Sequence, residues 1–270
     1  MMRQKQHIVQ RYEDELLHLR SLMEQMGGLV EHQLSLILAG IAENDGRTAL
    51  QAARQDDEVD ALEQKVETLA IRLLALRSPM AADLREIVAC IPMAGALERM
   101  GDYASSIARR LSQMEQPLPR PARLALSEMG RLVLEHLRRI MDALAHKDAN
   151  AAHAIWAADQ LVDKYCEAMT ADSLEQMTRH PHTIRLHISL LFIIRNLERI
   201  GDHTTNMAER VVFMVTGATL PPTRPHGHDS QPLPPGQESP SPGNPLPAPR
   251  KALFLSWRMN PPCGSFWNTA

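Results

Sequence analysis

The chain contains one six-residue segment twice, and this duplication constrains its fold more than any other feature. One copy reads Leu-Glu-Arg-Met-Gly-Asp and ends at Asp102, and the other reads Leu-Glu-Arg-Ile-Gly-Asp and ends at Asp202. In each copy the two acids (Glu98 and Asp102, Glu198 and Asp202) are four residues apart, about one helical turn. Both acids therefore share a helix face, where like charges repel by about 0.2–0.5 kcal/mol on an isolated helix. We expect such a repeated pair to face a cation.

Apolar residues recur at helical spacing through most of the chain, in six long stretches. The composition agrees, because Leu, Ala, Met, Glu, Gln and Arg are plentiful and lose little rotamer freedom in a helix. The predicted helices cover residues 6–43, 47–77, 81–111, 122–146, 150–179 and 182–215. Turn signals, such as Asn44-Asp45-Gly46 and Ser78-Pro79, separate them.

The second three helices repeat the first three. A shift of 103 residues places Asp45 on Asp148, and a shift of 100 superposes the two six-residue segments. The sequence thus predicts an all-α fold of two tandem three-helix bundles, since short turns join long antiparallel helices. The predicted domains are 1–116, 117–217 and a Pro-rich disordered C-terminal tail, 218–270.

Two features depart from this regular pattern. Pro92 lies inside the third predicted helix, where it removes a backbone hydrogen bond, so we expect a local kink. The segment 251–270 regains aromatic residues, including Trp257 and Trp267, without a helical period. It is either a non-essential extension or a short peptide that docks on a partner.

Charge and composition exclude several functional classes. The formal charge is −3 and the pI is near 6.5, without the basic stripe of a nucleic-acid binder. The N-terminal residues lack the apolar core of a signal peptide, and no apolar run approaches the length of a membrane span. Cys90 and Cys166 fall in apolar helical patterns, which favours small core residues. We expect a cytoplasmic protein.

A second set of acid pairs, Asp56/Asp60 and Asp159/Asp163, lies on the helix preceding each six-residue segment. Asp60 precedes the break at Pro79 by 19 residues, and Glu98 follows it by 19. An antiparallel helix pair with these distances brings the two acid pairs of one half level. The spacing in the second half is similar, so the sequence predicts one cluster of four carboxylates in each half.

Four converging carboxylates need protonation, arginine partners or a bound cation. Carboxylate oxygens suit Mg²⁺, Ca²⁺, Mn²⁺ or iron, and Zn²⁺ stays a further candidate. Neighbouring Arg99 and Arg199 leave a structural charge network as the alternative. The predicted metal ligands are Asp56, Asp60, Glu98, Asp102, Asp159, Asp163, Glu198 and Asp202. His203 follows the second segment, but Tyr103 takes its place in the first, so the duplicated design does not require it.

The duplicated pattern resembles the PhoU family of phosphate-transport accessory and regulatory proteins. The resemblance covers about residues 6–216. It rests on both six-residue segments, on Asp83-Leu84-Arg85, on His203 and on Asn206-Met207-Ala208-Glu209. It implies two three-helix bundles with metal sites built from E/D-x-x-x-D motifs, which map onto the acid pairs named above.

The resemblance also implies a non-enzymatic role. Members of the family repress the phosphate-starvation response when phosphate is plentiful, and they restrain phosphate uptake. They act between the Pst phosphate ABC transporter, through its ATPase subunit, and the PhoR sensor histidine kinase, and they often form homodimers. We therefore expect a homodimeric regulator that reaches the membrane only through its partners.

Two other functions stay open. A carboxylate-bridged di-iron enzyme or metal-storage bundle would need Glu-x-x-His motifs on facing helices. The chain offers Glu15-x-x-His18, but the duplicated pattern supplies no partner for it. A purely structural helical scaffold would tolerate removal of the acids without any loss of function.

Overall fold

The computed structural model describes residues 2–158 and 160–221, and all the regular structure in these ranges is helical. This confirms the predicted all-α fold. The first half comprises α1 (Met2–Glu43), α2 (Gly46–Leu50), the 3₁₀ turn η1 (Ala52–Gln55), α3 (Asp56–Arg77) and α4 (Ala81–Ser112). The second half comprises α5 (Arg120–His146), α6 (Ala149–Ala157), α7 (Gln160–Arg179), the 3₁₀ turn η2 (Pro181–Thr183) and α8 (Ile184–Thr216).

The duplicated turns have the same local structure in both halves. The carboxylate of Asp45 accepts a hydrogen bond from the backbone N–H of Arg47, and that of Asp148 accepts from Asn150 and Ala151. Each aspartate is therefore the N-cap of the helix that follows, which satisfies otherwise unpaired backbone donors. The sequence prediction of a repeated turn is confirmed at this level of detail.

The second helix of the first half is not continuous, contrary to the prediction of one helix over 47–77. It divides into α2, η1 and α3, so that α3 begins at Asp56. The side chain of Gln33, fully buried on α1, donates to the Ala52 carbonyl over 3.2 Å. This bond ties the Ala52 carbonyl to α1, and a tighter 3₁₀ turn follows there. In the second half the predicted helix 150–179 likewise divides, into α6 and α7.

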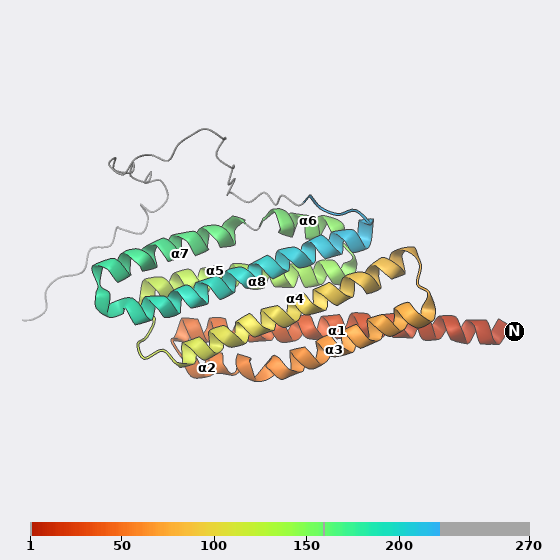
Figure 1. Ribbon diagram of the computed structural model, residues 1–270, viewed down its shortest axis with the longest axis horizontal. Coiled ribbons are helices and arrows are strands. Elements are labelled where there is room, and N and C mark those ends of the chain that lie inside the picture. Colours follow the sequence, from red (N-terminus) through yellow and green to blue (C-terminus); the bar gives the residue numbers. More distant parts are fainter. Residues whose placement is uncertain (1, 159, 222–270) are drawn as a thin grey trace, which may run out of the picture. The chain divides into compact units, whose positions relative to one another are not determined.

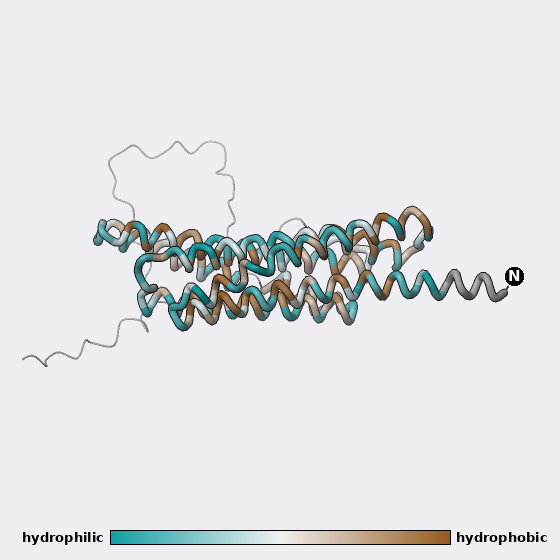
Figure 2. Tube along the Cα trace, turned by 90° about the horizontal axis from the view of Figure 1, so that it is seen from below, coloured by the Kyte–Doolittle hydropathy of each residue, from teal (hydrophilic) through white to brown (hydrophobic). Residues whose placement is uncertain are grey.

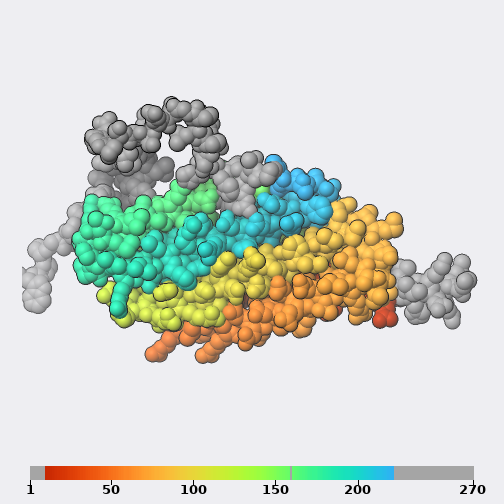
Figure 3. Space-filling model, viewed as in Figure 1, coloured from red at the N-terminus to blue at the C-terminus, as the bar shows by residue number. Residues whose placement is uncertain are grey.

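The helices pack first within each half and then between halves. In the first half α1, α3 and α4 contact one another, and in the second half α8 contacts α5, α6 and α7. The halves meet where α4 packs along α8 and α1 packs along α5. Figures 1 and 3 show α8 running beside α4. Both six-residue segments therefore lie on helices of the same seam.

Each helix turns an apolar side to this interior. Figure 2 shows apolar and polar residues interspersed along the helices, as amphipathic helices require. Leu97 directly precedes the acid pair of α4, Met100 lies between its two acids, and both are fully buried. The equivalent residues of α8, Leu197 and Ile200, are fully buried too. The apolar residues of the repeated segments thus fix the rotation of α4 and α8, and the acids are left on the side that faces α3 or α7.

Further predictions concern Pro92, the boundary between the two halves, the C-terminal tail and membrane spans. Helix α4 continues through Pro92, which is exposed, and the local kink stays a prediction. The predicted boundary between residues 116 and 117 falls between α4 and α5, and residues 222–270 of the predicted tail lie outside the described residues. Within residues 2–158 and 160–221, none of the helices combines the length and apolarity needed to cross a bilayer.

Candidate metal centres

Helices α3 and α4 bring five carboxylates together, which we call the first acidic cluster. Its members are Asp56, Asp60, Glu63, Glu98 and Asp102. Gly101 lies on α4 directly before Asp102, where α4 faces α1 and α3. A Cβ there would lie 3.3 Å from Oε1 of Gln33 on α1, which is a tight contact, and 3.6 Å from a methyl of Val59 on α3, which is an ordinary one. The glycine, which costs about 1 kcal/mol in a helix interior, thus leaves room for the side chain of Gln33.

The charges of this cluster repel one another. Burial, followed by repulsion from Asp102, Glu63 and Asp60, raises the pKa of Glu98 to about 7. Burial and the negative charges of Asp56 and Asp60 also raise the pKa of Asp102. A carboxyl with a pKa near neutrality is one whose negative charge is poorly compensated by its surroundings.

Cations lie at the edge of the first acidic cluster and not at its centre. Arg109 pairs with Asp56 over 3.1 Å, and its side chain is 54% exposed. Among the described residues, no Lys or Arg side chain lies within 4.0 Å of the carboxylate of Glu63 or Glu98. The central carboxylates therefore have no ion-pair partner within 4.0 Å, although the more distant charge of Arg99 partly opposes the rise in the pKa of Glu63 and of Glu98.

A buried amide also points into this region. The Nε2 group of Gln33 donates to Ala52, which leaves its Oε1 atom turned toward α4. This oxygen lies 3.3 Å from the position that a Cβ on Gly101 would take. Gly101 directly precedes Asp102 and follows Glu98 by three residues. Gln33 is fully buried, and within the described residues its Oε1 atom has no hydrogen-bond partner. An unpaired buried acceptor costs about 1–3 kcal/mol, and a metal ion or its bound water would satisfy it.

Helices α7 and α8 bring together a second acidic cluster, formed by Asp163, Glu198 and Asp202. Here the protein supplies its own cation. Arg195 donates to the carboxylate of Glu198 over 2.7 Å and to the sulfur of Cys166 over 4.0 Å. Burial still raises the pKa of Glu198, but the charge of Arg195 opposes the shift. The remaining predicted ligand, Asp159, lies outside the described residues.

The structure therefore brings seven of the eight predicted residues into two clusters, as the spacing of the acid pairs suggested. Within residues 2–158 and 160–221, no three His, Cys, Asp or Glu side chains already converge as ligands around one point. A cation would have to draw the carboxylates inward against their mutual repulsion. The first acidic cluster fits such an ion by its poorly compensated charge and by the oxygen of Gln33, whereas the second already contains a guanidinium.

Sequence reasoning did not place four residues at these clusters, although they set the charge and the polar contacts there: Gln33, Glu63, Cys166 and Arg195. The signal for two of them was present in the duplication. A shift of 103 residues places Glu63 on Cys166, which shows that the fifth acid belongs to the first half alone. Gln33 could not be found in this way, because its importance depends on a contact between α1 and the turn after α2.

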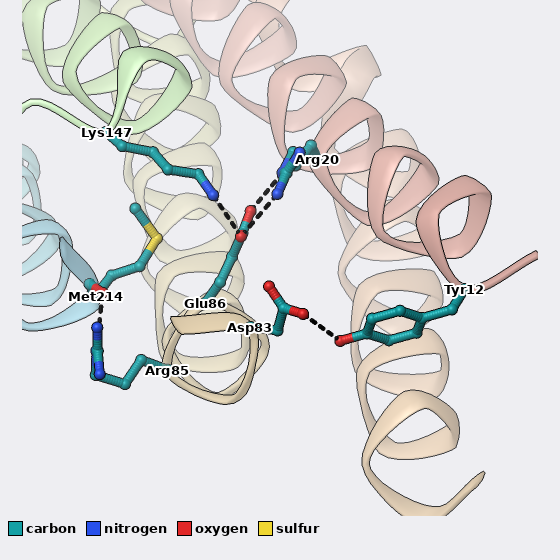
Figure 4. A network of polar contacts seen from close by, with 7 residues as sticks. All are labelled: Tyr12, Arg20, Asp83, Arg85, Glu86, Lys147 and Met214. Atoms are coloured by element: carbon teal, nitrogen blue, oxygen red, sulfur yellow. Dashed lines mark hydrogen bonds and ion pairs between the residues drawn. The ribbon is translucent and has the colours of Figure 1, made fainter. Parts of the chain in front are cut away.

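Glu86 on α4 is a buried carboxylate outside both clusters, and it provides a contrast (Figure 4). It is 5% exposed, and it accepts from Arg20 on α1 and, over 2.7 Å, from Lys147 at the end of α5. Burial alone would raise the pKa of Glu86, but the hydrogen bonds from these two cations hold it below its ordinary value. Glu86 is thus a satisfied ion-pair centre that joins the two halves.

The Asp83-Leu84-Arg85 segment also has structural partners in this network (Figure 4). Asp83 accepts from the hydroxyl of Tyr12 over 3.0 Å, and Arg85 donates to the backbone carbonyl of Met214 over 3.1 Å. The latter bond satisfies one of the unpaired carbonyls at the C-terminal end of α8. This segment therefore holds the start of α4 against α1 and α8.

The histidine motif at the N-terminus has a structural explanation as well. Glu15 accepts from Arg72 over 2.7 Å and from Arg77 over 2.9 Å. The Arg77 hydrogen bond is the main reason why the pKa of Glu15 is lowered.

His203 stacks on Tyr103 at a centroid distance of 5.7 Å, in the seam between α4 and α8. Neither arrangement supplies the facing Glu-x-x-His motifs of a di-iron site.

Comparison with known proteins gives a consistent result. The family described as the PhoU domain matches residues 23–111 and 126–211, once in each half. A phosphate-specific transport system accessory protein PhoU homolog from Caulobacter vibrioides is 39% identical over 221 residues, 82% of this chain and 96% of its own length. The homolog from Zymomonas mobilis is 38% identical, over 80% of this chain and 91% of its own length.

Solved structures agree with the sequence comparison. The crystal structure of PhoU from Pseudomonas aeruginosa superposes with a TM-score of 0.74 at 33% identity and covers 77% of this chain and 100% of its own. The phosphate transport system regulatory protein PhoU from Streptococcus pneumoniae gives a TM-score of 0.72 at 29% identity, over 78% of this chain and 99% of its own.

Proposed function

The chain belongs to the PhoU family, and we propose that it is an accessory protein of phosphate transport that represses the phosphate-starvation response when phosphate is plentiful. In this proposal it couples the ATPase subunit of a Pst-type phosphate transporter to a PhoR-type histidine kinase. It acts as a cytoplasmic homodimer without catalysis, and it restrains phosphate uptake.

One observation carries the proposal: the PhoU domain matches both halves of the chain, and relatives matched over nearly their whole length are named phosphate transport accessory proteins. These names support a role in phosphate transport, and the contact with the transporter is part of the proposal. The link to the kinase is part of the proposal.

The proposal includes a divalent cation or iron at the acidic clusters. Asp56, Asp60, Glu98 and Asp102 would hold it in the first half, and Asp163, Glu198 and Asp202 would do so in the second. The ion would supply positive charge that pulls α3 toward α4 and α7 toward α8. Gly201 lets Val162 of α7 approach α8 closely, and Gly101 leaves room for the amide oxygen of Gln33 beside the first cluster.

Exposed apolar side chains support docking on a partner. At the tip where α3 turns into α4, Met80 is 80% exposed and Leu76 is 68% exposed. The equivalent end of the second half exposes Leu174, Ile184 and Ile188. Apolar residues gathered at an exposed tip are typical of protein interaction sites. We propose the α3–α4 tip as a contact with the transporter.

A deletion strain tests the regulatory role. The gene is deleted and a phosphate-starvation reporter is followed in phosphate-rich medium, with the full chain or residues 1–217 supplied from a plasmid. We expect the reporter to turn on in the deletion strain and to be silenced by both forms. A reporter that stays off in the deletion strain contradicts the proposal.

A second experiment tests the metal component separately. We expect Ala at Glu98, Asp102, Glu198 and Asp202 together to abolish bound metal without loss of helical circular dichroism. The matched control is Ala at Glu128 and Glu135, two exposed acids of α5 that pair with Arg131. Metal content that is unchanged in the quadruple variant contradicts the site assignment.

A further inference from the structure

The two acidic clusters differ at one facing pair of positions. In the first half Glu63 on α3 lies over Gly95 on α4, and its Oε1 atom is 3.4 Å from the position a Cβ on Gly95 would take. The same positions in the second half hold Cys166 on α7 and Arg195 on α8, which are in contact. An acid facing a glycine has thus been exchanged for a thiol facing an arginine.

This exchange reverses the charge that each pair contributes. Glu63 adds a fifth carboxylate to the first acidic cluster, and Gly95 leaves the space into which it leans. Arg195 adds a guanidinium to the second acidic cluster, and Cys166 is a buried neutral thiol whose pKa is raised by burial. The pair in the first half adds one negative charge, and the pair in the second half adds one positive charge.

Arg195 already pairs with Glu198, one of the predicted metal ligands. Its Nη1 atom is 2.7 Å from Glu198 Oε1, a charge-assisted hydrogen bond of ordinary length. Glu198 is 19% exposed and Arg195 is 61% exposed, so the guanidinium can leave the carboxylate toward solvent. A cation entering the second acidic cluster must first displace it, whereas one entering the first meets the unpaired oxygen of Gln33.

We propose that Arg195 is a built-in competitor of the metal, so that the two acidic clusters load in order, the first tightly and the second weakly. Glu63 is an additional ligand of the first. The proposal rests on metal binding as part of the proposed function. Its consequence is a protein with two metal-loaded states across a range of cation concentration.

Titration with Mn²⁺ alone, followed by calorimetry and by the electron paramagnetic resonance of free Mn²⁺, tests the order. We expect two affinity classes in the wild-type chain. Arg195→Ala should tighten the weak class by roughly tenfold. The cation then no longer has to break a contact between Arg195 and Glu198, and tenfold in affinity corresponds to about 1.4 kcal/mol. Gly95→Arg should weaken the tight class. Arg131→Ala, which removes another exposed helical arginine on α5, is the matched control and should change neither.

Variants of each cluster assign the classes. The double variant Glu98→Gln/Asp102→Asn should lose the tight class of Mn²⁺ sites. The double variant Glu198→Gln/Asp202→Asn should lose the weak class. Circular dichroism of each variant verifies the helical fold, and Arg195→Gln repeats the test if the alanine variant misfolds. Absence of Mn²⁺ binding by the wild-type chain overturns the metal component of the proposed function. Two equal sites that do not respond to Arg195→Ala overturn the loading order alone.

Discussion

The two acidic clusters come from one duplicated pattern, but only the second has an arginine paired with its central glutamate. In the first, Glu98 is surrounded by other carboxylates and its pKa is raised to about 7. In the second, Glu198 is paired with Arg195 over 2.7 Å. A repeated motif therefore fixes where the carboxylates stand, and the residues facing it decide what neutralises them.

The contrast extends to the residues behind the clusters. Position 33 on α1 is Gln, and its equivalent on α5 is His136, which is buried with a pKa lowered by burial. The amide of Gln33 bonds to Ala52 and leaves an oxygen beside Gly101, whereas the close neighbours of Gly201 are Val162 and Val133. The first half thus offers a polar lining near its carboxylates, and an apolar contact takes the same place in the second.

The largest expected effect is on metal affinity. Replacing Glu98 and Asp102 by Ala should weaken the tighter Mn²⁺ site by at least about a hundredfold, because two charged ligands are lost. The same change at Glu198 and Asp202 should leave that site within a factor of about three. Calorimetric titration of the two double variants measures both. Equal losses in the two variants would erase the difference between the clusters.

The next effect concerns a carboxylate whose charge is fully compensated. Glu86→Gln should lower the free energy of unfolding by about 2 kcal/mol, because Arg20 and Lys147 lose their shared partner while both keep some solvent. Urea unfolding followed by circular dichroism measures the change. Glu128→Gln, on the exposed face of α5, is the control and should change stability by less than about 0.5 kcal/mol.

The pH dependence of this contribution has a definite sign. The pKa of Glu86 is lower in the folded chain than in the unfolded one. Its stabilisation is therefore present above the unfolded pKa and is lost as the pH falls through the folded pKa. Wild type and Glu86→Gln should differ in stability at pH 7 and converge at acid pH. A difference that grows on acidification would contradict the ion pairs in Figure 4.

Neutralising one carboxylate in each cluster sharpens the comparison without metal. In a chelator-treated protein at pH 8, Glu98→Gln should stabilise the fold by about 1 kcal/mol. It removes a partly buried charge and the repulsion of that charge by Asp102, Glu63 and Asp60. Glu198→Gln should be neutral or destabilising, since it removes the partner of Arg195. Thermal unfolding of both variants gives the two signs. Stabilisation of the same size in both variants would mean that Arg195 does not compensate Glu198.

The smallest expected difference lies where the two halves are alike. Asp45→Ala and Asp148→Ala each remove an N-cap and should each cost about 1 kcal/mol. Urea unfolding should place the two variants within about 0.5 kcal/mol of each other. A large gap between them would show that the halves differ in stability as a whole, and not at the clusters alone.

The sequence was sufficient for the features that depend on local pattern. The helical periods, the repeated turns at Asp45 and Asp148, and the meeting of acids on adjacent helices all follow from spacing along one or two helices. The interruption between α2 and α3 could not be predicted, because it accompanies a hydrogen bond from Gln33, nineteen residues away. Arg195 was equally hidden, because only the contact with Cys166 and Glu198 distinguishes it from an ordinary surface arginine.

The unequal clusters can be tested most directly by locating the metal itself. Crystals grown with one equivalent of Mn²⁺ per chain are measured for anomalous scattering. We predict one strong peak between α3 and α4, beside Glu63 and Glu98, with Arg195 still on Glu198. Peaks of equal height in both clusters, or a peak at the second cluster alone, would contradict the account.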